Sequence, residues 1–346
     1  MRLWVVVLTI SLAAGCTGPA NGNAPPSTRT PLEQLVPEDP RQKSGPSTAT
    51  VADPDVVPIS DQVVPNLPAT VTDAQGTDVT VTSVDRILAF DRHGTLGATV
   101  FALGLGDRMA GRDLSTGFPA AARLPLITAN GHQLDAGAIT RLRPTVVLTD
   151  TSLGPWDVVQ QLRDSGVPVV VTDSRRAINN VATLIHQVAD ALGVPAEGRE
   201  LAGRTNLEIE KTKIAAQKLS GDSEPRIVFL YLRGGAGVHQ ILGEGTGADE
   251  LITAVGGVDA ASATGLRGAV PIDPDALVKA APDVILVMSG GLQSVGGVDG
   301  LEALPGVART PAGQKRRVVD MDDHQVLGFG PLTASVIDGL ARALYT

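Results

Sequence analysis

The chain has a single cysteine in 346 residues and few aromatic side chains, and each shortage excludes a class of function. One cysteine permits neither a disulfide within the chain nor a metal site built from several thiolates. Aromatic residues make up 3% of the chain, too few for the stacking surfaces that bind nucleic-acid bases or sugars. A net charge of −9 argues against nucleic-acid binding, because that interaction needs clustered lysine and arginine. No metalloprotease, serine-hydrolase, phosphate-loop or dinucleotide motif is present, so an enzyme is not expected.

The N-terminal 16 residues have the pattern of an export signal. One arginine precedes an apolar run over residues 3–14, and small residues lead to Cys16. The segment resembles a bacterial lipoprotein signal in which a lipidated Cys16 becomes the new N-terminus, although Ala13 stands where such signals usually carry leucine. An ordinary secretory signal with an incidental cysteine is the alternative. Residues 17–68 are rich in Pro, Ser, Thr, Asn and Asp without apolar periodicity, which predicts a disordered tether. We expect a protein anchored by lipid at the extracellular face of the cell membrane.

Residues 226–235 read Arg-Ile-Val-Phe-Leu-Tyr-Leu-Arg-Gly-Gly and predict a buried strand that ends in a loop. Side chains alternate faces along a strand, so Tyr231 and Arg233 are expected on the same face near its end. The arginine charge favours the phenolate form of the tyrosine, an anionic oxygen suited to ferric iron. The alternative is that Tyr231 caps a hydrophobic core and Arg233 is solvated.

Residues 134–148 and 272–286 repeat one α/β unit. Each places an aspartate before a short helical stretch that a proline ends, and an apolar strand follows. This repetition predicts two similar α/β lobes, residues 69–175 and 222–346. Residues 176–221 between them have helical apolar spacing, which predicts a helical spine. The expected fold is α/β, with two Rossmann-like lobes joined by a long rigid helix and a ligand cleft between the lobes.

Four segments resemble one protein family. They are residues 124–134, with Ala-Asn-Gly-His-Gln-Leu, 228–234, 245–257, with Gly-Thr-Gly-Ala-Asp-Glu-Leu-Ile, and 304–331, with Gly-Phe-Gly-Pro. The chain is similar to the substrate-binding lipoproteins of ABC importers in the helical-spine class (class III, or cluster A). It is most similar to the heme-binding proteins of actinobacterial hemin uptake (HmuT type). The resemblance implies an extracytoplasmic monomer that captures ferric heme, as heme b, and delivers it to an ABC permease and its ATPase.

The resemblance also implies the residues that hold the heme. It places a histidine from the first lobe and a tyrosine from the second lobe on the iron, with an arginine hydrogen-bonded to the tyrosine. In this sequence these residues are His132, Tyr231 and Arg233. Imidazole and phenolate are both sound axial ligands for ferric heme. Met288 resembles a methionine that lines the heme pocket of the family, and core filling is its alternative role.

Docking on the permease in this family usually relies on one surface glutamate from each lobe. Glu250 is the candidate in the second lobe. Ala98 stands where the glutamate of the first lobe is expected, so either Asp107 replaces it or docking is asymmetric. Among the other histidines, His93 is a candidate propionate contact or spare ligand, and His239 is expected to make surface or loop hydrogen bonds.

Neither of the two remaining histidines is assigned to the ligand site. His186 falls in a helical pattern and is expected to be structural, and no role is predicted for His324. A ferric siderophore or cobalamin is the alternative ligand. A heme-dependent envelope enzyme or heme-relay protein is a further alternative, but two filled axial positions leave no open site for chemistry. Free zinc or manganese needs three or four converging ligands, which the scattered histidines do not suggest.

Overall fold

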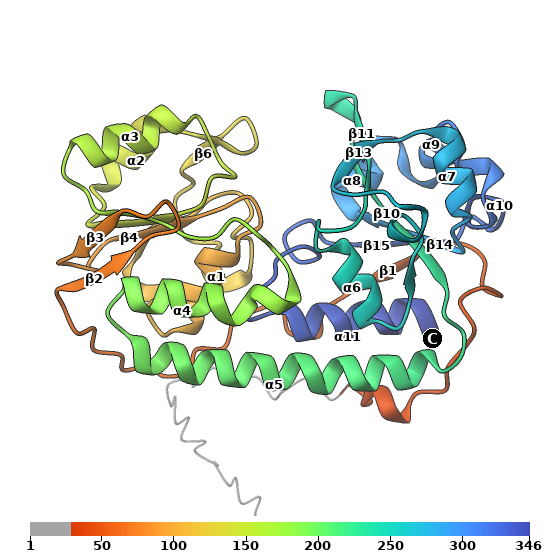
Figure 1. Ribbon diagram of the computed structural model, residues 1–346, viewed down its shortest axis with the longest axis horizontal. Coiled ribbons are helices and arrows are strands. Elements are labelled where there is room, and N and C mark those ends of the chain that lie inside the picture. Colours follow the sequence, from red (N-terminus) through yellow and green to blue (C-terminus); the bar gives the residue numbers. More distant parts are fainter. Residues whose placement is uncertain (1–28) are drawn as a thin grey trace, which may run out of the picture.

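The computed structural model describes residues 29–346. The predicted export signal at residues 1–16, its Cys16 and the start of the predicted tether lie outside the described residues. Two α/β lobes stand side by side above one long helix (Figure 1). The predicted fold class is therefore confirmed. Within the described residues, no helix combines the length and the apolar character needed to cross a lipid bilayer.

The N-terminal lobe is built on a parallel sheet whose strands lie in the order β5 (Met109–Gly111), β4 (Ile87–Phe90), β8 (Val146–Thr149) and β9 (Val169–Val171). Alternate residues of β4 pack against two helical layers, because side chains alternate faces along a strand. Figure 1 shows these layers below and above the sheet, namely α1 (Thr95–Ala102) with α4 (Val181–Ala191), and α2 (Ala136–Leu142) with α3 (Trp156–Asp164). Two antiparallel pairs complete the lobe. One is the hairpin of β2 (Ala69–Thr72) and β3 (Asp78–Val81), and the other is the small pair β6 (Thr128–Ala129) and β7 (Gln133–Leu134).

The C-terminal lobe has a mixed sheet in the order β1 (Ser47–Ala49), β15 (Val318–Met321), β14 (Val284–Met288), β10 (Arg226–Arg233), β11 (Val238–Leu242) and β13 (Ala269–Pro271), and β12 (Val258–Asp259) pairs with the start of β10. The strands from β1 to β10 run parallel, whereas β11 is antiparallel to both of its neighbours. The helices of this lobe are α6 (Ala248–Ala254), α7 (Pro274–Ala280), α8 (Ser289–Ser294), α9 (Gly297–Glu302), α10 (Pro311–Lys315) and α11 (Thr333–Tyr345). The carboxyl ends of β10, β14 and β15 therefore lie side by side, which positions the loops that follow them.

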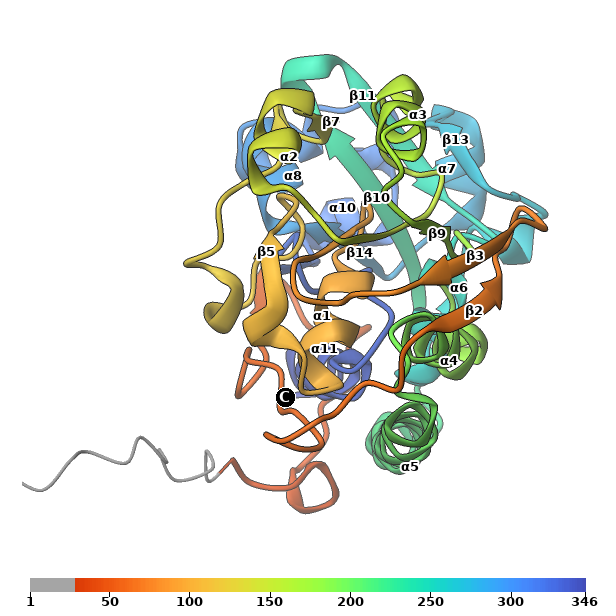
Figure 2. The ribbon, with the colours of Figure 1, turned by 90° about the vertical axis from the view of Figure 1, so that its left-hand side faces the viewer.

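The two lobes are joined by α5 (Pro195–Ser220), whose 26 residues span about 39 Å at 1.5 Å per residue. Figure 2 looks along this helix and shows α4 and α11 packed against it. Leu201, Ile209 and Ala216 of α5 belong to one hydrophobic cluster that continues into both lobes. The packed core is therefore continuous along the connecting helix from one lobe to the other.

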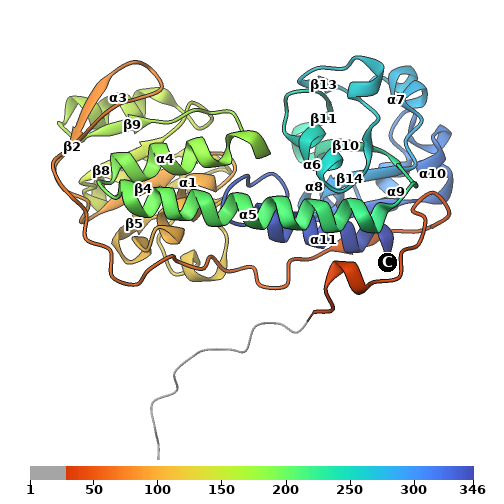
Figure 3. The same ribbon diagram turned by 60° about the horizontal axis from the view of Figure 1, so that its bottom comes forward.

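The prediction of a disordered tether is wrong for residues 29–68. Strand β1 adds to the edge of the C-terminal sheet, and Ala49, Val56 and Val63 are buried. Figure 3 shows this segment running along the underside of the molecule beside α5, where Arg204 donates a hydrogen bond to its backbone. The apolar side chains of the segment pack on surfaces formed by distant parts of the chain, so the segment needs no apolar periodicity of its own.

The predicted α/β repeat is confirmed in detail. Asp135 and Asp273 both cap their helices by accepting hydrogen bonds from backbone N–H groups of the first turn. Arg143 and Ala281 end the two helices with φ angles of 46° and 45°, and a proline follows each. The strands β8 and β14 then enter the centres of the two sheets. The same local signals therefore form the same unit in each lobe.

Candidate functional site

A cleft of about 760 Å³ lies between the two lobes, and loops at the strand ends of both lobes form its walls. The N-terminal wall comes from the loops after β4 and β5 and from the turn between β6 and β7. The C-terminal wall comes from the end of β10, from α8 and from the loop after β15. The cleft is lined by all four residues that sequence analysis assigned to heme, His132, Tyr231, Arg233 and Met288.

Tyr231 and Arg233 lie at the end of β10, and both side chains face the cleft as predicted. The guanidinium of Arg233 stacks over the phenol, with its Cζ 4.6 Å from the ring centroid. The hydrogen bond from Arg233 to Tyr231 that the resemblance implies is not formed in this structure. Instead, Arg233 Nη2 forms an ion pair with Asp323 at 3.1 Å and contacts Met288 Sδ at 3.4 Å. The carboxylate of Asp323 attracts the guanidinium, which explains the difference.

Met288 is buried at the end of β14 and belongs to the hydrophobic core, yet its sulfur atom also contacts the guanidinium that faces the cleft. The two roles weighed from the sequence, core filling and pocket lining, are therefore combined in one side chain. Methionine suits this position because its thioether is polarisable and apolar at the same time.

His132 lies in the turn between β6 and β7, where Asn130 (φ 48°) and Gly131 (φ 86°) both adopt left-handed conformations. Its imidazole is half-buried, and this burial, aided by the charges of Arg92 and Arg233, lowers its pKa. Its Nδ1 atom is buried and has no hydrogen-bond partner among residues 29–346. The lowered pKa keeps the imidazole neutral at physiological pH, and the neutral form is the one that ligates metals.

Two further histidines line the same cleft, and sequence analysis assigned no role to one of them. Burial lowers the pKa of His93 to about 4, so this imidazole is neutral as well. The Nδ1 of His324 lies 3.0 Å from Asp322 Oδ1, and this hydrogen bond raises the pKa of His324. Asp322, Asp323 and His324 directly follow β15. The argument from strand ends that singled out Tyr231 could have found them too.

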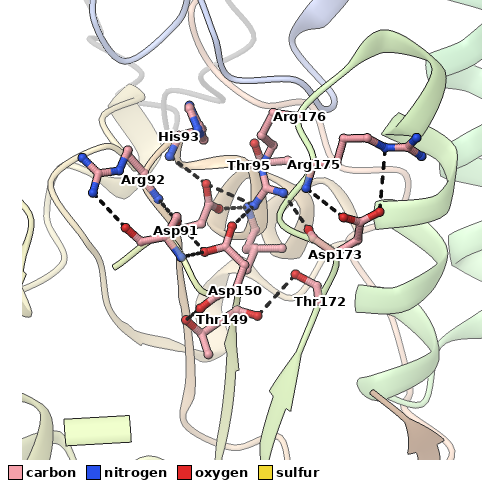
Figure 4. A network of polar contacts seen from close by, with 12 residues as sticks. Asp91, Arg92, His93, Thr95, Thr149, Asp150, Thr172, Asp173, Arg175 and Arg176 are labelled. Carbon is pink, nitrogen blue, oxygen red and sulfur yellow. Dashed lines mark hydrogen bonds and ion pairs between the residues drawn. The ribbon is translucent and has the colours of Figure 1, made fainter. Parts of the chain in front are cut away.

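A buried network of charges supports the N-terminal wall of the cleft (Figure 4). Arg176 Nη2 lies 2.7 Å from Asp150 Oδ2 and 3.4 Å from Asp91 Oδ1. Asp91 follows β4, and its carboxylate accepts a hydrogen bond from the backbone N–H of His93 at 2.7 Å. Burial raises the pKa of the neighbouring Asp113 to about 7. The network fixes the backbone that carries His93, which sequence analysis did not foresee because its members come from separate strand ends.

Residues 96–324 match the family model described as periplasmic binding protein, which spans most of both lobes. The chain belongs to the periplasmic binding protein family. Among curated proteins, no match to the chain was found.

Solved structures of other family members resemble this periplasmic binding protein closely. The heme-binding protein HmuT is 41% identical and superposes with a TM-score of 0.85, over 89% of this chain and 100% of that one. The periplasmic heme-binding protein RhuT from Roseiflexus sp. RS-1, in its apo form, is 38% identical, with a TM-score of 0.69 over 75% of this chain and 98% of that one. The periplasmic heme-binding protein BhuT, in complex with two hemes, is 34% identical, with a TM-score of 0.66 over 75% and 97% of the two chains.

In this periplasmic binding protein, two histidines that sequence analysis did not assign to heme, His239 and His186, lie away from the cleft. His239 pairs with Leu232 in the β10–β11 ladder, so it lies on the face of the sheet opposite Tyr231. His186 lies on α4 and is absent from the cleft lining. Within residues 29–346, no three His, Cys, Asp or Glu side chains are arranged to hold a metal ion.

The candidate docking residues have different surroundings. The Glu250 carboxylate, on α6, accepts hydrogen bonds from the backbone N–H and the Nδ2 of Asn179 at 3.1 and 2.8 Å. This contact joins the C-terminal lobe to the short 3₁₀ helix η4 (Ile178–Asn180), beside a second cavity of about 950 Å³. Ala98 is buried on α1, whereas the Asp107 side chain is 96% exposed. The docking role of Glu250 stays a prediction.

Proposed function

We propose that this periplasmic binding protein captures ferric heme in the cleft between its lobes, with His132 and Tyr231 as the two axial ligands. It then delivers the heme to an ABC permease and its ATPase for iron uptake. The observation that carries the proposal is that an imidazole from one lobe and a phenol from the other line a single cavity of about 760 Å³. A cavity of that size suits a small cofactor, and one ligand from each lobe would grip both faces of a flat macrocycle.

The solved relatives support this assignment. HmuT, RhuT and BhuT are each described as heme-binding proteins. Structures of HmuT also exist in which a single histidine, tyrosine or arginine is replaced by alanine. Along that chain these three residues are separated by the same intervals as His132, Tyr231 and Arg233. The equal intervals favour these three residues as the functional set in this chain.

The chemistry of the donor set fits heme as the transported ligand. His132 is neutral and carries a buried Nδ1 without a partner among the described residues, an arrangement that a bound group can satisfy. The guanidinium places positive charge over the ring of Tyr231, whose oxygen would become a phenolate on iron. With both axial positions filled, the iron has no open site, so a carrier is proposed and not an enzyme. The ligand is proposed to be heme b, and the carrier a monomer.

Membrane attachment and docking belong to the same proposal. Cys16 is proposed to carry a lipid that holds the protein at the extracellular face of the cell membrane. Glu250 is proposed to meet the permease, which requires that its hydrogen bonds to Asn179 break or adjust on docking.

A hemin titration tests the function. The full-length protein, Tyr231→Ala and His132→Ala are titrated with hemin while the Soret absorbance is followed, and His239→Ala serves as control because it lies on the opposite face of the same sheet. We expect one saturable transition in the wild type and in the control, and a lost or shifted transition in the other two variants. A transition that is unchanged in Tyr231→Ala, or the absence of any saturable transition in the wild type, would refute the assignment. Either result would favour a ferric siderophore as ligand.

A further inference from the structure

Asp323 follows β15 and connects two elements that meet at the C-terminal wall of the cleft. Its Oδ1 accepts a hydrogen bond of 2.7 Å from the backbone N–H of Gly290, in the first turn of α8. Its Oδ2 forms the 3.1 Å ion pair with Arg233. A Cβ at position 290 would lie 3.0 Å from both carboxylate oxygens, so the glycine makes room for this contact. Asp323 is therefore held through one carboxylate oxygen by Gly290 and contacts Arg233 through the other.

The guanidinium of Arg233 is oriented by this carboxylate. Its Nη1 donates to the carbonyl oxygen of Leu232 at 2.9 Å, and its Nη2 contacts both Asp323 and Met288. As a result, its Cζ lies over the ring of Tyr231, 4.6 Å from the centroid, and the group makes no hydrogen bond to the phenol oxygen. A guanidinium stabilises a phenolate most when it donates directly to the oxygen.

Two anions would compete for this one guanidinium when heme is bound. One is the Asp323 carboxylate, and the other is the phenolate that forms as Tyr231 binds ferric iron. We infer that Asp323 is a positioning residue: by holding Arg233 away from the phenol oxygen, it leaves the iron-bound phenolate less stabilised, which favours heme release. This inference rests on the proposed function.

The isosteric variant Asp323→Asn separates charge from shape. The amide oxygen still accepts from Gly290, but the negative charge that holds Arg233 is removed. Arg233 then turns toward the phenolate, and the site gains one unit of positive charge close to the iron-bound oxygen. For one charge at this partly buried depth, we expect heme release to slow about tenfold.

The experiment measures hemin transfer from the loaded full-length protein to excess apomyoglobin by stopped-flow absorbance. The proteins compared are the wild type, Asp323→Asn, Arg233→Ala and the double variant. The phenolate-to-iron charge-transfer band is recorded for each loaded protein, since a purely structural role would not move it. Glu244→Gln is the matched control, because Glu244 forms an ion pair of the same 3.1 Å length with Arg267 in the same lobe and does not line the cleft.

The expected result is slower release and a shifted charge-transfer band in Asp323→Asn, with both effects lost when Arg233 is alanine. Unchanged or faster release in Asp323→Asn would overturn the inference. The same slowing in the Arg233→Ala background would also overturn it, because Asp323 would then act without Arg233. If the wild type fails to bind hemin saturably, the proposed function itself is refuted, which is a separate result.

Discussion

Replacing Arg176 with methionine should strongly destabilise the N-terminal lobe, because this guanidinium neutralises two buried carboxylates. The Arg176 side chain is 2% exposed, and those of Asp91 and Asp150 are fully buried. Its Nη2 lies 2.7 Å from Asp150 and 3.4 Å from Asp91. Methionine keeps most of the apolar length of the side chain but leaves both carboxylates in the core without a cation.

The magnitude follows from the burial of the pair. Removing one partner of a buried ion pair typically lowers the free energy of unfolding by about 3–5 kcal/mol, out of the ~5–15 kcal/mol that stabilise a domain. Arg175→Met is the matched control at the neighbouring position. The Arg175 side chain is 60% exposed and its ion pair with Asp173 spans 3.9 Å, so its removal should cost less than about 1 kcal/mol. Urea unfolding followed by circular dichroism at pH 8 compares the two variants with the wild type.

The stability deficit of Arg176→Met, meaning its loss of unfolding free energy relative to the wild type, should be smaller in acid. Burial already raises the pKa of Asp150 in the wild type, whereas at Asp91 burial is outweighed by the Arg176 charge together with backbone hydrogen bonds, which hold its pKa below the usual value. Without the cation, both pKa values in the folded state rise, above the ~4 of the unfolded chain. The folded variant then binds more protons than the unfolded chain, so its stability falls as pH rises. We expect the largest deficit at pH 8 and the smallest near pH 5. Equal urea midpoints for Arg176→Met and Arg175→Met at pH 8, or a deficit that grows toward pH 5, would refute the reasoning.

Three smaller changes test other parts of the fold. Tyr345→Phe removes the hydroxyl that donates to the Val255 carbonyl at 2.8 Å, and should lower the free energy of unfolding by about 1 kcal/mol; an unchanged melting temperature would contradict this. Ala281→Gly relieves the positive φ of 45° at the end of α7, and should raise stability by roughly 1 kcal/mol in the same thermal assay, where a lower melting temperature would argue against backbone strain. Asn179→Asp places a second carboxylate beside that of Glu250, and this repulsion should speed amide hydrogen exchange in α6. Unaltered exchange would show that the contact between Asn179 and Glu250 does not stabilise α6.

The confirmed predictions depend on residues that are close together in the chain. The caps of Asp135 and Asp273 depend on contacts within one helical turn, so the repeat could be found without knowing the fold. The shared face of Tyr231 and Arg233 follows from the period of two along a strand. The tether prediction failed over residues 29–68 because their packing partners, such as β15, lie far along the chain.

The resemblance to a family supplied what local patterns could not. No local signal selects His132 over the other histidines, and its place opposite Tyr231 depends on how two lobes sit on α5. His324 was missed for the same reason, although it lies only three residues after the end of β15, and Tyr231 lies two residues before the end of β10. The role of a polar loop residue is decided by what lies across the cleft from it.

The sequence by itself determined the two α/β lobes, the connecting helix and the side of the strand on which Tyr231 and Arg233 lie, because these depend on periodicity and capping over short spans. Only the tertiary structure decided where the charges meet. Arg176 neutralises carboxylates from two different strand ends, and Arg233 pairs with Asp323 instead of the neighbouring phenol. Electrostatic attraction depends on distance in space, and the packing of lobes and helices sets that distance for residues far apart in the chain.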